Sequence, residues 1–269
     1  MKKILYILTA CIGLLTSCAK DDDLESVENT EYERLTPGDT KYSYLKVLNL
    51  TPGSPVVNYY IDGTKFSASL ASSGIENAGY TYNGLFPDFG YAATTPGSHK
   101  LTAKIIPTAA ADASLEVLNT TISPAPGKYY TIYTTGQYSA TNKMLGTPFV
   151  LEDVKPALDT SKIFVRLVNL AIGLPNIDLV KGPLVTDPKI ITNIGYGQAS
   201  DWVVVPNLGP GTAPTVPLWY INADTGAPLS TAVSNVILTK GRAYTLYIRG
   251  IFGTTGTTAV TTTFYTTFF

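Results

Sequence analysis

The fold is decided by the stretch GKYYTIYTTG, residues 127–136, and by its recurrence as GRAYTLYIRG at residues 241–250. Within the first stretch, Tyr130, Ile132 and Thr134 alternate with the residues between them, so they share one face of an extended chain. A period of two is typical of a β-strand with one buried face. The recurrence therefore predicts two strands in equivalent surroundings, 114 residues apart.

A second pair of similar stretches lies upstream in the same order. LKVLNL at residues 45–50 recurs as VRLVNL at residues 165–170, an offset of 120 residues. Because both matches keep their order and nearly their spacing, the chain is predicted to hold two copies of one domain. We place the first copy at residues 42–155, a surface linker at residues 156–162 and the second copy at residues 163–269, and we expect each copy to have its own core.

The predicted fold class is all-β, with two tandem immunoglobulin-like antiparallel β-sandwich domains. Turn signals such as Asp62-Gly63 separate short runs rich in Tyr and Thr, and no long stretch shows helical periodicity. Short strands with a turn about every 8–12 residues are typical of a β-sandwich. In the second copy, Leu238, Gly241 and Tyr244 are spaced like a tyrosine corner, although a core tyrosine at a strand start explains the spacing equally well.

Three stretches carry a family resemblance: NLTPGSPVVNYYIDG at residues 49–63, YGQASDW at residues 196–202, and the glycine-bounded residues 241–250. They are similar to an uncharacterised family of exported bacterial β-sandwich domains, classed as a domain of unknown function, whose repeats end in G-x-x-Y-T-x-x-x-x-G. The second copy departs from the pattern at residues 176–182, where the Asp-Gly turn is missing. The resemblance implies the fold and an exported location, and it carries over no catalytic residue.

Residues 1–17 are typical of a bacterial lipoprotein signal peptide. Two lysines precede an apolar run at residues 4–15, which is shorter than the roughly 20 residues of a transmembrane helix. The run closes with LTSC at residues 15–18, which looks like a lipobox. We therefore expect cleavage before Cys18 and lipidation of this cysteine, for example with palmitate chains, which anchors the mature chain to a membrane. The alternatives are an ordinary signal peptide with a chance cysteine, or a short membrane helix.

Residues 18–41 are predicted to be a lipidated cysteine followed by a disordered acidic tether. Residues 19–41 hold eight acidic and three basic side chains and almost no large apolar ones, a composition that cannot bury enough surface to fold. KDDD at residues 20–23 resembles the acidic signal that sends some lipoproteins to the outer cell surface, and a solvated spacer explains it as well. We expect an outer-membrane lipoprotein, either on the cell surface or facing the periplasm.

Charge and residue types argue against several classes of function. Residues 42–269 carry fourteen basic and twelve acidic side chains, so their net charge of +2 offers no attraction to nucleic acid. With His99 as the one histidine and Cys18 as the one cysteine after the signal peptide, we expect no metal and no cofactor. We interpret His99 as an exposed strand-edge residue rather than a proton shuttle. Scattered carboxylates and the lack of a phosphate loop indicate a protein that is not an enzyme, with a hydrolase as the remote alternative.

One stretch suggests a binding surface: YTYNGLFPDFGY, residues 80–91, which is longer than its counterpart at residues 196–202. Aromatic faces held on a rigid loop suit a sugar ring or a protein partner. The candidate ligand-binding residues are Tyr82, Phe86, Phe89 and Tyr91. In the alternative interpretation, Tyr82 and Tyr91 are core strand residues and only Phe86 and Phe89 belong to the loop.

These observations predict a non-catalytic module that is held on the membrane through Cys18 and binds or adheres to a glycan or a protein at the bacterial surface. The alternative is a structural subunit or spacer of a surface assembly, which the tandem copies and the Thr/Tyr-rich strands also fit.

We predict that Cys18→Ser abolishes lipidation, because a serine hydroxyl cannot replace the cysteine thiol as the lipidated group. The measurement is fractionation of cells that express the variant, together with the size of the mature protein. A Cys18→Ser protein that stays in the membrane fraction at mature size would contradict the lipoprotein interpretation.

Overall fold

The computed structural model describes residues 35–70, 73–229 and 233–269. The predicted signal peptide, Cys18 and the tether up to residue 34 lie outside these ranges. The chain divides after Pro37, and the strands described below belong to the unit Gly38–Phe269. In the described part of the chain, no helix is long and apolar enough to cross a membrane.

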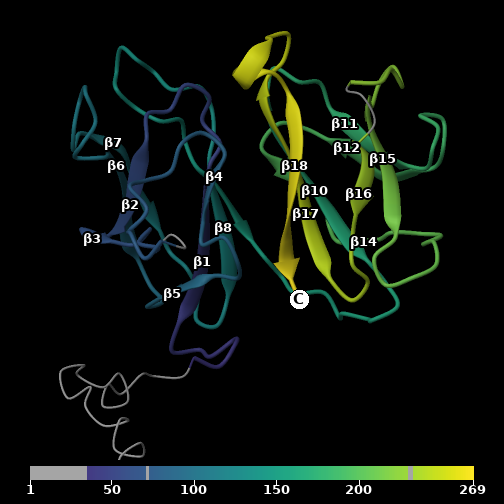
Figure 1. Ribbon diagram of the computed structural model, residues 1–269, viewed down its shortest axis with the longest axis horizontal. Helices are drawn as coiled ribbons and strands as arrows, with labels where there is room; N and C mark the ends of the chain where they lie inside the picture. The colour runs from purple at the N-terminus through teal and green to yellow at the C-terminus, as the bar shows by residue number, and fades with distance from the viewer. Residues whose placement is uncertain (1–34, 71–72, 230–232) are drawn as a thin grey trace, which may run out of the picture. The chain divides into compact units, whose positions relative to one another are not determined.

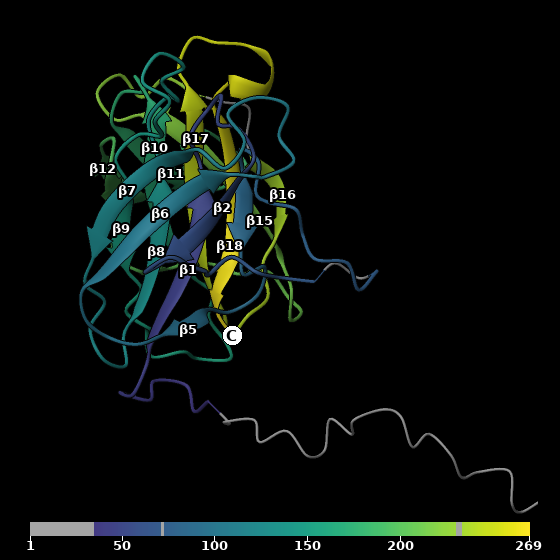
Figure 2. The ribbon, with the colours of Figure 1, turned by 90° about the vertical axis from the view of Figure 1, so that its left-hand side faces the viewer.

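The first sandwich consists of two packed sheets (Figure 1). One has the order β4-β1-β8-β9, with β5 also paired to β1, and the other has the order β3-β2-β6-β7. Their bounds are β1 Ser43–Asn49, β2 Val57–Ile61, β3 Thr64–Lys65, β4 Gly84–Phe86, β5 Ala92–Thr94, β6 His99–Ile105, β7 Glu116–Ile122, β8 Tyr129–Thr134 and β9 Phe149–Glu152. Figure 2 views this sandwich from the side of β2, β6 and β7.

The second sandwich repeats this arrangement with the orders β13-β10-β17-β18, with β14 also paired to β10, and β12-β11-β15-β16. A 3-10 turn, η2, precedes the last strand. The bounds are β10 Phe164–Ile172, β11 Ile177–Lys181, β12 Lys189–Ile194, β13 Gln198–Ala199, β14 Val203–Val204, β15 Thr215–Asn222, β16 Val233–Ile237, β17 Ala243–Ile251, η2 Gly256–Thr258 and β18 Thr261–Phe268.

The prediction of tandem β-sandwiches is confirmed, with one correction to the strand directions. In each sandwich the glycine-bounded strand runs parallel to the first strand: β8 pairs with β1, and β17 pairs with β10. The sheets are therefore mixed rather than purely antiparallel. Parallel neighbours need a crossover connection, and here the chain crosses through the opposite sheet before it returns. The segment between β9 and β10, which includes the predicted linker, contains no strand.

Each sandwich has a core between its own two sheets. The alternation read from the sequence fills it, since Ile132 with Tyr130 packs in the first core and Leu246 with Tyr244 in the second. Both tyrosines also bond back to the chain five residues upstream: the hydroxyl of Tyr244 accepts from the backbone N–H of Thr239 at 2.8 Å, and that of Tyr130 accepts from Ala125 at 3.3 Å. The tyrosine-corner interpretation is confirmed, and it applies to both sandwiches.

A third apolar cluster joins the two sandwiches and was not predicted. It explains why β1 is buried along its whole length, since one face of this strand packs in its own sandwich and the other against the second sandwich. In Figure 1 the sheet with β1 and β8 accordingly lies beside the sheet with β17 and β18. The buried members of the cluster are Leu48, Leu50, Tyr133, Val168, Leu170, Tyr247 and Tyr265.

We predict that residues 163–269 prepared alone melt cooperatively, because their apolar core is formed within that segment. Their free energy of unfolding should be lower than that of residues 42–269, since Val168, Leu170 and Tyr247 lose their cover. Thermal and urea denaturation of both proteins, followed by circular dichroism, measures the difference. A broad, non-cooperative transition for residues 163–269 would argue against separate cores.

Candidate functional site

The aromatic stretch predicted as a binding surface contains a true insertion. In the first sandwich β1 pairs Leu48 with Leu85 and Leu45 with Ala92, so six residues, 86–91, connect the two pairings. In the second sandwich the equivalent pairings leave only three residues, 200–202. The second sandwich connects the equivalent pairings with three fewer residues. The three additional residues of the first sandwich are therefore not required by the fold and can serve a function such as binding.

Phe86 is not part of an exposed surface, which corrects the prediction that it binds ligand. Its side chain is only 5% exposed and lies edge-on to Phe66 and Tyr80, with ring centroids 5.3 and 5.9 Å away. The physical reason is strand register: Phe86 pairs with Val47, whose side chain lies in the core of the first sandwich.

Phe89, by contrast, is 83% exposed and stands at the tip of the insertion. The residues on either side of the tip are held by buried groups. The carbonyl of Pro87 accepts a 2.7 Å hydrogen bond from the ammonium group of Lys46, and the hydroxyl of Tyr91 donates to Asp153 Oδ2 at 2.8 Å. Hydrogen bonds at Pro87 and Tyr91 therefore fix both ends of the segment that carries Phe89.

Tyr82 and Tyr91 face the second sandwich instead of solvent. The guanidinium carbon of Arg249 lies 4.8 Å from the centre of the Tyr82 ring. The ring of Tyr91 stacks on Phe268 at 6.1 Å. Neither tyrosine lies in a strand, so the alternative interpretation, in which both are core strand residues, was also wrong. Of the four predicted ligand-binding residues, the structure leaves Phe89 exposed.

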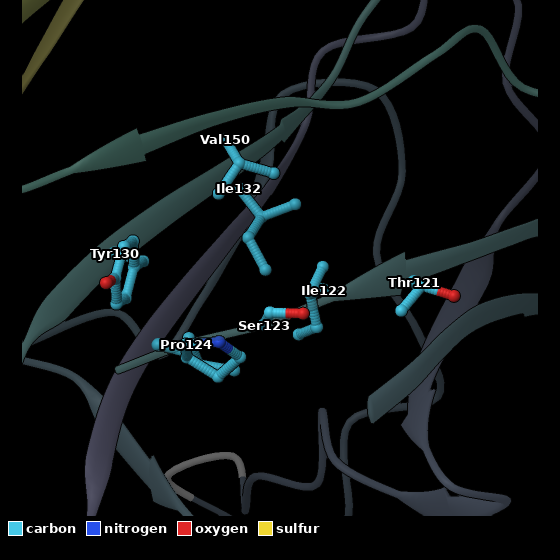
Figure 3. Close-up of a pocket in the computed structure, with 8 residues that line it drawn as sticks. Thr121, Ile122, Ser123, Pro124, Tyr130, Ile132 and Val150 are labelled. Atoms are coloured by element: carbon cyan, nitrogen blue, oxygen red, sulfur yellow. The ribbon is translucent and has the colours of Figure 1, made fainter. Parts of the chain in front are cut away.

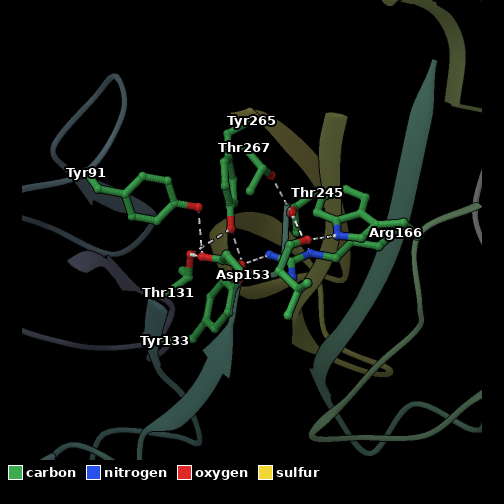
Figure 4. Close-up of polar contacts among 10 residues, drawn as sticks. Tyr91, Thr131, Tyr133, Asp153, Arg166, Thr245, Tyr265 and Thr267 are labelled. Atoms are coloured by element: carbon green, nitrogen blue, oxygen red, sulfur yellow. Dashed lines mark hydrogen bonds and ion pairs between the residues drawn. The ribbon is translucent and has the colours of Figure 1, made fainter. Parts of the chain in front are cut away.

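Tyr91 belongs to a buried polar cluster between the sandwiches (Figure 4). Asp153 Oδ2 also accepts a 2.6 Å hydrogen bond from the hydroxyl of Thr131, while Oδ1 accepts from the guanidinium of Arg166. Arg166 donates in addition to the hydroxyl of Thr245 at 2.8 Å and lies 4.6 Å from the Trp202 ring. Both charged side chains are buried, so this ion pair is fully desolvated.

Two tyrosines complete the cluster. The hydroxyls of Tyr133 and Tyr265 lie 2.7 Å apart, and Tyr265 donates to the hydroxyl of Thr131 at 3.2 Å. Burial raises the pKa of both phenols, as it does for Tyr91, so all three stay protonated and can donate hydrogen bonds. Because both oxygens of Asp153 are occupied by donors, the geometry favours a structural over a catalytic role for this carboxylate.

Lys46 occupies the position in the first sandwich that Arg166 occupies in the second. Each lies opposite an equivalent threonine of the neighbouring parallel strand, Lys46 opposite Thr131 and Arg166 opposite Thr245. Lys46 is only 1% exposed, and its ammonium lies over the rings of Tyr91 and Tyr265 at 5.6 and 5.5 Å. Burial lowers the pKa of Lys46 to about 8. Sequence reasoning missed this cluster; the available signal was one basic residue at the same position of two matching, mostly apolar stretches, LKVLNL and VRLVNL.

His99 is the first residue of β6, which lies between β2 and β7, and its side chain is only 10% exposed, so the interpretation as an exposed strand-edge residue is wrong. Its Nδ1 is 2.6 Å from Asp62 Oδ2 and its Nε2 is 2.7 Å from the carbonyl of Thr95, so both ring nitrogens face acceptors. The hydrogen bond with Asp62 raises the pKa of His99. The contact fixes the Asp62-Gly63 turn against β6. The described residues also contain no group of three or more His, Cys, Asp or Glu side chains that could hold a metal ion.

A cavity of about 230 Å³ opens in the first sandwich (Figure 3). Its lining contains no carboxylate and no basic side chain, so it can bind but offers no acid–base chemistry. Sequence reasoning did not find it, because it forms between the last strands of two separate sheets, β7 and β9. The lining residues are Leu45, Thr121, Ile122, Ser123, Pro124, Tyr130, Ile132 and Val150.

The strand orders and cores define the class of this protein: an all-β protein built from tandem β-sandwiches. The chain belongs to the family DUF4397, a domain of unknown function, whose profile matches residues 43–180. The match covers the first sandwich and continues into β11 of the second, so it does not stop at the predicted linker.

Two solved structures are similar to the chain at low levels. A family 26 carbohydrate-binding module from Eubacterium rectale Amy13K, in complex with maltoheptaose, shares 16% identity over 83% of this chain and 97% of its own, with a TM-score of 0.24. A proposed cell adhesion protein from Bacteroides fragilis shares 10% identity over 93% of this chain and 90% of its own, with a TM-score of 0.18. Scores this low carry no inference about function. No curated protein matches the chain significantly.

We predict that Asp153→Asn lowers the free energy of unfolding by about 3–5 kcal/mol, because it leaves the guanidinium of Arg166 buried beside a neutral group. Urea denaturation measures the loss. The neighbouring Glu152→Gln is the control: the Lys128–Glu152 pair is largely exposed, so its loss should change stability by no more than about 0.5 kcal/mol. Equal stabilities of the two variants would show that the buried pair does not hold the sandwiches together.

Proposed function

We propose that this protein is a non-catalytic, lipid-anchored binding or adhesion module of the bacterial outer membrane, exposed at the cell surface, with a glycan or a protein as its ligand. The observation that carries the proposal is Phe89, a large apolar side chain that is almost fully exposed at the tip of an insertion. An exposed aromatic ring costs free energy in water, and such rings are common at the centres of binding surfaces.

The base of the insertion supports this role. Lys46 bonds the carbonyl before the tip, and Asp153 bonds the hydroxyl of the tyrosine after it. A loop fixed in this way loses little conformational entropy when a ligand binds, so more of the contact energy contributes to affinity. Asp88, the residue before Phe89, is also exposed and offers a hydrogen-bond acceptor to a hydroxyl or amide of the ligand.

The proposed anchor would place this surface at a distance from the membrane. The lipidated Cys18 and an acidic segment of some twenty residues precede the first sandwich. A flexible segment of that length reaches on the order of 25 Å. The tip of the insertion would then be presented to partners outside the membrane plane.

A structural subunit or spacer is the second candidate, and the contact between the sandwiches favours it. The buried ion pair and the apolar cluster between the sheets resist bending between the two sandwiches. A rigid pair of domains can set a distance without any ligand. The two candidate functions differ in one respect that can be tested: only the binding function requires the exposed ring of Phe89.

We predict that Phe89→Ala lowers affinity for a ligand found on a glycan or surface-protein array by about tenfold, the effect of losing about 1.4 kcal/mol of contact energy. Its free energy of unfolding should stay within about 0.5 kcal/mol of wild type, since the ring is exposed. Binding to the array and urea denaturation are measured on the same preparations.

Two variants serve as controls for this prediction. Leu184→Ala removes an exposed side chain from the second sandwich and should change neither property. Phe86→Ala opens a cavity in the core and should cost about 3–5 kcal/mol of stability. Undiminished binding by Phe89→Ala would exclude the tip as the ligand contact and leave the spacer role as the better candidate.

A further inference from the structure

We propose that the cavity of the first sandwich is a binding site for a small, uncharged aromatic molecule, with its ring edge-on to Tyr130 (Figure 3). This site is distinct from the tip at Phe89, because none of the lining residues belongs to the insertion. The inference does not depend on the proposed adhesion function.

The position of the cavity follows from the sheet order. β9 is the last strand of one sheet and β7 the last strand of the other, so the cavity lies between two sheet edges. Leu45, Ile132 and Val150 line it from the β1-β8-β9 sheet, while Ile122 and the residues after β7 line it from the opposite side. Val150 is 46% exposed, so the cavity is accessible from solvent at β9.

The second sandwich shows which group this position of the fold accepts. Val150 pairs with Ile132, and at the equivalent pairing Phe264 stands opposite Leu246. The ring of Phe264 lies edge-on to Tyr244, the counterpart of Tyr130, at 6.1 Å and 72°. A phenyl ring is thus held beside the corner tyrosine in one sandwich, and a smaller valine occupies that place in the other.

The lining selects the chemistry of the ligand. Leu45, Ile122, Ile132 and Val150 provide apolar walls, and edge-on contact with Tyr130 favours an aromatic over an aliphatic ring. No charged side chain lines the cavity, so a charged ligand would lose its hydration without compensation. The hydroxyl of Ser123 can bond one polar substituent. Apolar cavities of about 150 Å³ hold benzene in proteins, so about 230 Å³ accommodates a ring with short substituents.

The test uses p-cresol as the probe and the mature chain without its lipid. Titration followed by saturation-transfer and chemical-shift NMR should show saturable binding to the wild-type protein. Val150→Phe should reduce the affinity at least tenfold, because the new ring fills the space as Phe264 does in the second sandwich. Its thermal midpoint should equal or exceed that of wild type.

Matched controls make each outcome decisive. Val204→Phe adds the same ring at an exposed valine of the second sandwich and should bind p-cresol like wild type. Should Val150→Phe fail to fold, Val150→Leu fills less of the same space and should still weaken binding. Cyclohexanol should bind several-fold more weakly than p-cresol. No saturable binding to wild type, equal binding to the Val150 variants, or equal affinity for cyclohexanol would overturn the proposal.

Discussion

The ion pair between Asp153 and Arg166 is the interaction on which the arrangement of this protein depends. Removing two charges from water costs several kcal/mol for each ion, and their attraction compensates only when the remaining hydrogen-bonding positions are satisfied. Here the carboxylate has two further donors, Tyr91 and Thr131, and the guanidinium has the hydroxyl of Thr245 and the face of Trp202. Asp153 and Arg166 can pair only while the two sandwiches are in contact. Separating the sandwiches would leave each charge without its partner, so the ion pair favours the docked arrangement.

The two sandwiches share strand order and register but differ where they meet. Arg166 has a carboxylate partner from the first sandwich, whereas its counterpart Lys46 bonds a carbonyl and lies over two tyrosine rings. The hydroxyl of Thr267 contacts Thr245 at 2.7 Å, in the way that Asp153 contacts Thr131. The two sandwiches therefore share the ion pair between Asp153 and Arg166 at their contact. The other basic side chain, Lys46, instead bonds the insertion.

This asymmetry links the docking surface to the candidate binding surface. Lys46 and Asp153 face the interface between the sandwiches, and they also bond the two ends of the loop that carries Phe89. The order of the tip thus depends on domain docking. The cavity at β7 and β9 shows the same kind of difference between the copies, since Val150 of the first sandwich corresponds to the larger Phe264 of the second.

The strand positions, the tandem sandwiches and the equivalent positions of the two copies could be predicted from the sequence, because a period of two, turn residues and repeated spacing are local properties of the chain. The sequence also identified the insertion. Only the tertiary structure decided that Phe86 points into the core while Phe89 points out, because the direction of a side chain in a three-residue strand is set by its register against β1. The burial of Asp153, Arg166 and Lys46 likewise depends on which faces of two separate sheets pack together. Sequence periodicity shows that a face is buried, but it does not show which other surface covers it.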